Sequence, residues 1–222
     1  MRVVITAATT SEWMPAFVHL KDLYTNDSKR LKLQFYQSGV GMLSSAVSLT
    51  RLIYEEKPDL ILQVGIAGSF QPKLPIGKTV VVKEEILGDM GVEEKTGWKD
   101  IFDLKLEKGN YPPFEKRKLP NPWLKDYNLL KLPEIVGITN NQISTGEKRI
   151  KAIQKKYNPS IESMEGAALH YVCREFAIPF LQIRTISNFV GERDKAKWDI
   201  KTSINHLNKH ILTYLDKLYA LK

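Results

Sequence analysis

The alternation of two kinds of segment along the chain is the strongest constraint on its fold. Short apolar runs rich in β-branched residues occur six times, each bounded by Gly, Pro, Asn or Ser, as is typical of strands. They are RVVITA, LKLQFYQS, DLILQVGIA, TVVVKEEIL, EIVGITN and FLQIRTIS, and segments with helical spacing cover residues 11–23, 42–56, 146–156, 164–176 and about 200–219. This alternation predicts an α/β protein with a central, largely parallel or mixed β-sheet flanked by helices.

The length of the chain favours a single domain over residues 1–222. Of these 222 residues, 43% are hydrophobic, which is enough for one sizeable core. Residues 88–133 break the alternation, because they hold many Gly, Pro and aromatic residues without a clear period. We expect this segment to be an irregular insertion that wraps one edge of the sheet or covers a site.

Charge and cysteine content narrow the class of partner. Lys and Arg outnumber Asp and Glu by 33 to 25, and a net charge of +8 favours anionic ligands. The basic residues are spread out and carry no aromatic RNA-reading signature, so nucleic acid is not the predicted partner. The N-terminal segment MRVVITAATT lacks the ~7–15-residue hydrophobic core of a signal peptide. No apolar run approaches the ~20 residues that cross a bilayer, which predicts no membrane partner. Cys173 is the only cysteine and no Cys/His metal constellation is visible, so a reducing cytoplasm is the expected compartment.

Ligand sites in such sheets lie beyond the carboxyl ends of the strands, which directs attention to the segments that follow them. SGVGM, residues 38–42, has glycines that let a backbone approach a ligand, although an ordinary Gly-rich turn explains the same letters. GIAGSF, residues 65–70, is predicted to be a small-residue turn. Ala67 and Gly68 would leave a flat slot for a planar ring there, or the glycines would simply serve a tight turn.

Three polar side chains stand beside these turns. Glu165 begins a predicted helix, where a carboxylate either favours the helix dipole or accepts the two adjacent hydroxyls of a ribose. Asn188 ends an apolar strand, a position at which asparagine often caps a turn. Glu12 follows the first strand, where an acidic residue is favourable in the first turn of a helix.

Taken in order and spacing, Glu12, SGVG, VGIAGSF, ESMEGAA and RTISNFV resemble the nucleoside phosphorylase and nucleosidase superfamily. The resemblance covers nearly the whole chain outside residues 90–130, and LGDMGVEE, KDIFDL and ISNFVGERDKAKW are similar to its futalosine hydrolase branch. It implies hydrolysis of futalosine to hypoxanthine and dehypoxanthine futalosine, in menaquinone biosynthesis. It also implies a small-molecule nucleoside substrate, a homodimer or higher homo-oligomer, and no metal or organic cofactor.

The resemblance further implies roles for individual residues. Glu12 would activate the attacking water and Asn188 would contact the leaving base. The remaining candidates are Met164 and Glu165 at the ribose, Ala67, Gly68, Ile143 and Ser144 at the base, and Trp198 over the 5′ substituent. Arg193 is the candidate partner of a 5′ carboxylate, although an exposed arginine serves solubility or an internal ion pair equally well.

Glu12 and Asn188 also decide between related reactions. A carboxylate in the first loop would repel phosphate and can act as a base for water, which favours hydrolysis over phosphorolysis. The adenine-specific nucleosidases of this superfamily carry Asp at the position of Asn188. An amide cannot protonate N7, but its NH2 can donate to N7 or O6 of a 6-oxopurine such as hypoxanthine. A methylthioadenosine/S-adenosylhomocysteine nucleosidase, a 6-oxopurine nucleoside phosphorylase, a nucleoside-binding sensor and an RNA-binding protein remain alternatives.

Overall fold

A computed structural model describes residues 1–24 and 31–221 of the chain. The strands are β1 (Arg2–Ala7), β2 (Lys32–Gln37), β3 (Leu60–Ser69), β4 (Thr79–Leu87), β5 (Gly91–Glu94), β6 (Gly97–Asp100), β7 (Leu119–Pro120), β8 (Glu134–Thr139), β9 (Ile161–Ser163) and β10 (Phe180–Phe189). The helices are α1 (Met14–Tyr24), α2 (Met42–Glu56), α3 (Leu124–Tyr127), α4 (Glu147–Tyr157), α5 (Gly166–Glu175) and α6 (Ile200–Ala220), with short 3-10 turns η1 (Thr10–Glu12) and η2 (Lys195–Lys197).

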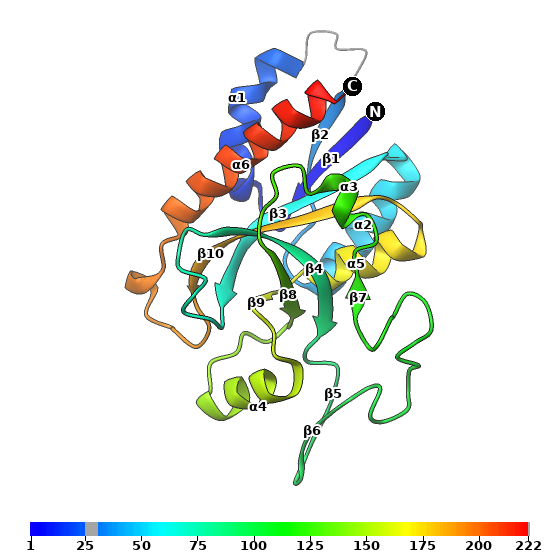
Figure 1. Cartoon of the computed structure of the whole chain (residues 1–222), viewed down its shortest axis with the longest axis vertical. Coiled ribbons are helices and arrows are strands. Elements are labelled where there is room, and N and C mark those ends of the chain that lie inside the picture. The colour runs from blue at the N-terminus through cyan, green and yellow to red at the C-terminus, as the bar shows by residue number, and fades with distance from the viewer. Residues whose placement is uncertain (25–30, 222) are drawn as a thin grey trace.

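Within the described residues, eight strands form one mixed sheet (Figure 1). The strand order is β10-β4-β8-β9-β3-β1-β2, with β7 beside β4. Because β10 also pairs with β3, the first five strands close on themselves and β1 and β2 extend from the ring. The prediction of a single α/β domain with a mixed central sheet is confirmed.

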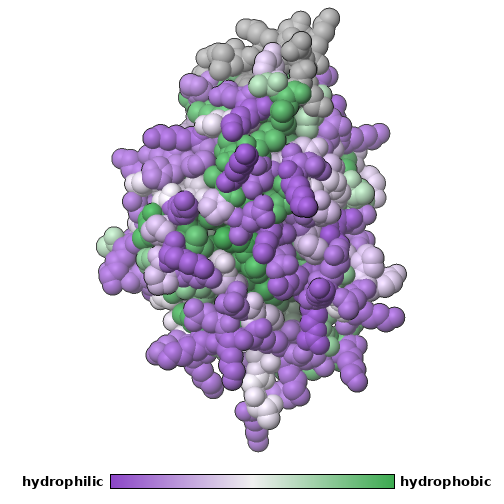
Figure 2. All heavy atoms as spheres, in the orientation of Figure 1, coloured by the Kyte–Doolittle hydropathy of each residue, from purple (hydrophilic) through white to green (hydrophobic). Residues whose placement is uncertain are grey.

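The helices cover both faces of the sheet (Figure 1). α1 and α6 lie side by side on one face, and α2 packs against α5 on the other. The apolar spacing of α6 shows why, because Leu207, Ile211, Leu215 and Leu218 recur every three or four residues and all are buried in the core under β1 and β3. No helix in the described ranges is long and apolar enough to cross a membrane. Hydrophilic side chains cover most of the face shown in Figure 2.

The prediction of a turn at GIAGSF is wrong. β3 continues through Ser69, and its second half pairs in parallel with β10, with Ala67 opposite Ile186 and Gly68 opposite Asn188. The glycine at position 65 meets a different requirement from that of a turn. A Cβ at Gly65 would lie 2.2 Å from Nη1 of Arg184, so the missing side chain makes room for a buried guanidinium inside the sheet.

Residues 88–133 contain short elements that the periodicity did not reveal. β5 and β6 form a hairpin that projects from the sheet (Figure 1), β7 pairs with β4, and α3 follows. Asp100, at the end of β6, accepts a hydrogen bond from the Tyr157 hydroxyl (3.1 Å) and ties the hairpin to α4. The ring of Phe114 lies edge-on against Tyr171 of α5. The segment therefore wraps the edge of the molecule formed by β4 and α5.

Glu85 on β4 is fully buried in the centre of this fold. Its carboxyl group accepts hydrogen bonds from Nε2 of Gln182 (2.9 Å) and from the Thr139 hydroxyl (3.0 Å). Burial raises the pKa of Glu85 to about 7, and the Gln182 hydrogen bond, Arg184 and Thr139 oppose the shift. The unfolded chain releases this proton near the ordinary Glu value, so rising pH favours unfolding from that value up to about 7.

Glu85→Gln is therefore expected to remove a pH-dependent cost to stability. Between about pH 4.5 and pH 8 the wild-type free energy of unfolding should fall by ~3 kcal/mol more than that of the variant. Gln retains one acceptor oxygen for the hydrogen bond from Nε2 of Gln182 and does not titrate. Urea titrations of both proteins across this pH range measure the difference. Parallel stability curves would show that Glu85 does not titrate in this window.

Candidate active site

A cavity of about 370 Å³ lies where the carboxyl ends of β1, β3 and β10 meet the loop after β8 and the start of α5. This volume suits a small organic ligand. Of the residues proposed from sequence, nine line it: Glu12, Ala67, Gly68, Ile143, Ser144, Met164, Glu165, Asn188 and Trp198. Arg193 does not line it, and neither does any described residue of 88–133. The insertion therefore does not cover this cavity within the chain.

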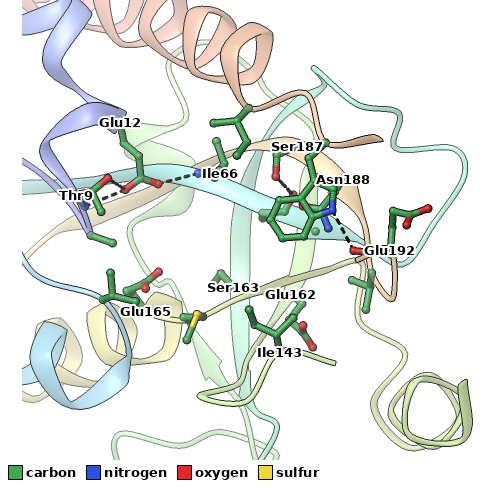
Figure 3. A pocket seen from close by; sticks show the side chains of 18 of the residues that line it. Thr9, Glu12, Ile66, Ile143, Glu162, Ser163, Glu165, Ser187, Asn188 and Glu192 are labelled. Atoms are coloured by element: carbon green, nitrogen blue, oxygen red, sulfur yellow. Dashed lines mark hydrogen bonds between the residues drawn. The ribbon is translucent and has the colours of Figure 1, made fainter. Parts of the chain in front are cut away.

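Glu12 is held rigidly at the end of η1 (Figure 3). Its Oε1 accepts the backbone N–H of Ile66 (3.1 Å) and its Oε2 accepts that of Thr9 (3.1 Å). Asn208 of α6 fixes the backbone behind it by donating to the Glu12 carbonyl (2.9 Å) and accepting from the Ala16 N–H (2.9 Å). Burial raises the pKa of Glu12, opposed by the positive charge of Arg184 and by the two backbone N–H groups. Such a carboxyl group is a stronger base for water than an ordinary glutamate.

Arg184 is the buried cation of the site and was not identified from sequence. It is 1% exposed, its Nη2 donates to Oε1 of Gln63 (2.7 Å), and its Nη1 lies 3.8 Å from Oε2 of Glu165. A Cβ at Gly65 would lie close to both Nη1 of Arg184 and Oε1 of Glu12. Arg184 therefore stands behind two cavity carboxylates at once. An arginine inside the apolar run FLQIRTIS was the signal that could have revealed it.

The SGVG segment holds Glu165 in place. The backbone N–H of Gly41, just before α2, donates to Oε1 of Glu165 (3.0 Å). Gly39 and Gly41 have φ angles of +83° and +87°, which favour glycine strongly. The backbone of this segment was expected to approach a ligand closely. In the structure it approaches the side chain of Glu165 instead. Glu165 keeps Oε2 for Arg184 and for a ligand.

Asn188 is the penultimate residue of β10, lies beside a bulge and is half-buried. Its Oδ1 accepts from the Ser187 hydroxyl (2.8 Å), and its Nδ2 donates to the carbonyl of Phe189 (3.0 Å). Because a carbonyl can only accept, this contact fixes which end of the amide is the NH2 group. A second N–H of Nδ2 remains for a ligand. Asn188 thus has a free N–H donor, as the predicted contact with a base requires. Its hydrogen bond to Phe189 also fits the alternative prediction that Asn188 caps a turn.

Ser144 and Glu162 form a third group in the cavity. The Ser144 backbone N–H donates to Oε1 of Glu162 (3.0 Å), and the Ser144 hydroxyl contacts Oε2. Asn140 Nδ2 also donates to Oε2 (2.6 Å). Ile143 stands beside them, 42% exposed. Glu162 was not identified from the sequence, because it lies within the short strand β9 and its place in the cavity depends on which strands pair.

Figure 3 shows two ends of the cavity: Glu12 and Glu165 lie on one side, and Asn188 and Glu162 on the other. Trp198 lines the wall near Glu192, to whose carbonyl its indole N–H donates (3.0 Å). The guanidinium of Arg193 lies over the Trp198 ring, 5.5 Å from its centroid. Arg193 is therefore adjacent to a residue of the cavity wall but does not itself line the cavity.

The charge of the lining limits the chemistry of the site. Four glutamates line the cavity, Glu12, Glu162, Glu165 and Glu192, whereas no Lys, Arg or His is among the described lining residues. An inorganic phosphate dianion would meet carboxylates without a facing cation. A neutral polyhydroxylated ligand suits the same surface, because carboxylates accept hydrogen bonds from hydroxyl groups.

Known proteins are similar to this chain in sequence and in fold. It is 27% identical over 179 residues to a futalosine hydrolase of Thermus thermophilus, an alignment that covers 80% of this chain and 78% of that protein. It is 24% identical over 212 residues to a 5′-methylthioadenosine/S-adenosylhomocysteine nucleosidase of Bacillus subtilis, covering 88% and 85% of the two chains.

Solved structures support the same fold. The native futalosine hydrolase of Helicobacter pylori superposes with a TM-score of 0.79 at 18% identity, covering 98% of each chain. A methylthioadenosine/S-adenosylhomocysteine nucleosidase from the same organism, with butyl-thio-DADMe-Immucillin-A, gives 0.78 at 19% identity over 98% of each chain. The family model described as Phosphorylase superfamily matches residues 7–219. The chain therefore belongs to the phosphorylase superfamily.

Proposed function

We propose that the protein hydrolyses the N-glycosidic bond of a purine nucleoside, with futalosine as its substrate and hypoxanthine as the released base. The lining of the cavity carries the proposal: it holds a buried carboxylate of raised pKa, Glu12, and among the described residues no cation that would bind phosphate. Curated relatives of both hydrolytic types support hydrolysis. Dehypoxanthine futalosine, the second product, would continue into menaquinone biosynthesis, and a reducing cytoplasm is the proposed compartment.

Each residue has a defined part in this reaction. Glu12 accepts a proton from a water whose oxygen forms a bond to the anomeric carbon. The bond from that carbon to N9 breaks, and its electron pair leaves with the base. Glu165 accepts hydrogen bonds from the ribose hydroxyls beside Met164, and the carboxylates stabilise positive charge that develops on the sugar. Asn188 donates to the base, where negative charge develops.

The choice of futalosine rests on the two ends of the substrate. Asn188 supplies an N–H donor and no acid, which suits a 6-oxopurine that departs with less proton transfer than adenine requires. Ala67 and Gly68 form the floor under the base, with Ile143 and Ser144 at its edge. At the 5′ end, Trp198 would pack against the aromatic part of futalosine. Arg193 would reach its carboxylate by leaving the face of the Trp198 ring.

The test uses purified protein in phosphate-free buffer with futalosine, inosine and methylthioadenosine in separate reactions. Chromatography then quantifies free hypoxanthine and adenine. Hypoxanthine release from futalosine, without added phosphate, is the expected result. Adenine release from methylthioadenosine alone would assign the chain to the other nucleosidase type, and release only after phosphate addition would make it a phosphorylase. Tight binding of a nucleoside without any release would indicate a sensor.

A homo-oligomer is the proposed assembly. Leu43, Val47 and Tyr54 stand on one side of α2 and are 79%, 61% and 68% exposed, an arrangement that a second copy of the chain would cover. Light scattering after size exclusion is expected to give at least twice the mass of the chain. Val47→Glu should reduce it to the monomer mass, whereas Val18→Glu, at an exposed valine of α1, should not. A monomeric wild type would refute this assembly.

A further inference from the structure

We infer that Glu162 determines base specificity by accepting a hydrogen bond from the N1–H of a 6-oxopurine. The inference rests on the proposed function, because it places a purine base in the cavity described above. Glu162 would contact the base in addition to Asn188. The residue lies on β9, two positions before Met164, and is 8% exposed.

The sheet register places Glu162 and Asn188 on either side of one glycine. Gly68 of β3 is paired with Asn188 of β10 on one side and with Glu162 of β9 on the other. Side chains at paired positions point to the same face of a sheet. Asn188 and Glu162 are thus two strand spacings apart, roughly 10 Å between their backbones. That gap accommodates a purine ring with a hydrogen bond at either edge.

Gly68 leaves the space between Glu162 and Asn188 open. It has no side chain to fill the face, and a Cβ there would already lie 3.1 Å from a methyl group of Val190 and 3.3 Å from Nδ2 of Asn188. A flat ring can therefore lie over the strand at this point. Figure 3 shows Asn188 and Glu162 at the same end of the cavity, opposite Glu12 and Glu165.

Glu162 retains the acceptor capacity that this role requires. Oε2 contacts Asn140 Nδ2 and the Ser144 hydroxyl, whereas Oε1 accepts only the Ser144 backbone N–H within the described chain. A carboxylate offers about four lone-pair positions, so Oε1 has one to spare. The three protein contacts also hold the carboxylate in a fixed orientation, which lowers the cost of ordering it when a base binds.

The chemistry of N1 explains the discrimination. In hypoxanthine N1 carries a hydrogen, whereas in adenine N1 presents a lone pair. A fixed carboxylate attracts the first and repels the second. Asn188 donates its remaining N–H to O6 or N7, so the two residues together complement the N1–H and O6 pattern of a 6-oxopurine. N7 of a 6-aminopurine would still accept from Asn188, so the discrimination rests on Glu162, which would face the lone pair of N1, and an unpaired buried polar group is costly.

Calorimetric binding of hypoxanthine and of adenine to wild type and to Glu162→Gln tests the inference. Gln has nearly the same shape but is neutral and has a single acceptor oxygen, for which the backbone N–H of Ser144, Nδ2 of Asn140 and the N1–H would compete. Hypoxanthine affinity is expected to fall by ~10–100-fold, as for a hydrogen bond to a charged group. Adenine affinity should not fall. Glu192→Gln, at another carboxylate of the same cavity, should leave the ratio of the two affinities at its wild-type value.

Two outcomes overturn the inference without touching the proposed function. One is an unchanged affinity ratio in Glu162→Gln while the wild type releases hypoxanthine from its nucleoside. The other uses the wild type alone, in case the variant fails to fold: 1-methylhypoxanthine has no N1–H, and equal affinity for it and for hypoxanthine would exclude the contact. If the wild type binds neither base and releases none, the proposed function and the inference fail together.

Discussion

Glu12→Gln is expected to lower kcat by ~10²–10⁴-fold, because the variant loses the base that accepts the proton of the attacking water. The change should act on turnover and leave ground-state binding largely intact. The amide oxygen can still accept the N–H of Ile66, so the loop keeps its main tether. Single-turnover rates with saturating nucleoside, together with KM, separate the two effects. A loss smaller than tenfold would show that another group activates the water.

The pH dependence of the wild type gives an independent check on Glu12. A base must be deprotonated to act, so activity should rise with pH through the pKa of Glu12. Burial raises that pKa, so the acidic limb of kcat/KM should lie above the ordinary range of a glutamate. Arg184→Met removes the nearby positive charge that opposes the shift and should move the limb to still higher pH. A limb at the ordinary glutamate value in both proteins would contradict this account.

The elements that the sequence revealed are those with a strong period. The helical spacing of residues 42–56 and 200–219 matches α2 and α6 within a residue or two, because each buries one continuous apolar stripe. β9, with three residues, and β7, with two, are too short to show a period at all. β5 and β6 project as an exposed hairpin, where little burial constrains the pattern.

The site was only partly predictable for a related reason. Glu12, Glu165 and Asn188 stand at the ends of elements, where a polar residue after an apolar run is visible in the sequence. Arg184 and Glu162 lie within strands, and their relation to the cavity depends on which strands pair. The pairing of Gly68 with both Glu162 and Asn188 joins three segments far apart in the chain, and no local pattern encodes it.

Asn188 is expected to show the second large effect. Asn188→Ala removes the donor aimed at the departing base, and loss of one such hydrogen bond typically costs ~10²–10³ in kcat. The backbone contacts of β10 with β3 should persist, because among the described residues the side-chain amide bonds to its neighbours Ser187 and Phe189 alone. Thermal unfolding of wild type and variant within ~2 °C of each other would confirm that the loss is catalytic.

Asn188→Asp tests whether the Asn188 side chain contacts the purine base or only caps a turn. Aspartate can accept from a 6-amino group and, when protonated, donate to N7, whereas the NH2 end of Asn188 can only donate and its Oδ1 already accepts from Ser187. The variant should therefore lose activity toward the hypoxanthine nucleoside and gain it toward an adenine nucleoside, which shifts the ratio of the two kcat/KM values toward adenine.

Glu162 limits the gain of activity toward adenine, because its carboxylate still faces N1. The double variant with Glu162→Gln should therefore favour adenine further than either change alone. A double-mutant cycle on the kcat/KM ratio measures the coupling between the two changes, which is expected to differ from zero when both side chains contact the same base. If both single variants leave the ratio at its wild-type value, the base is read elsewhere in the cavity.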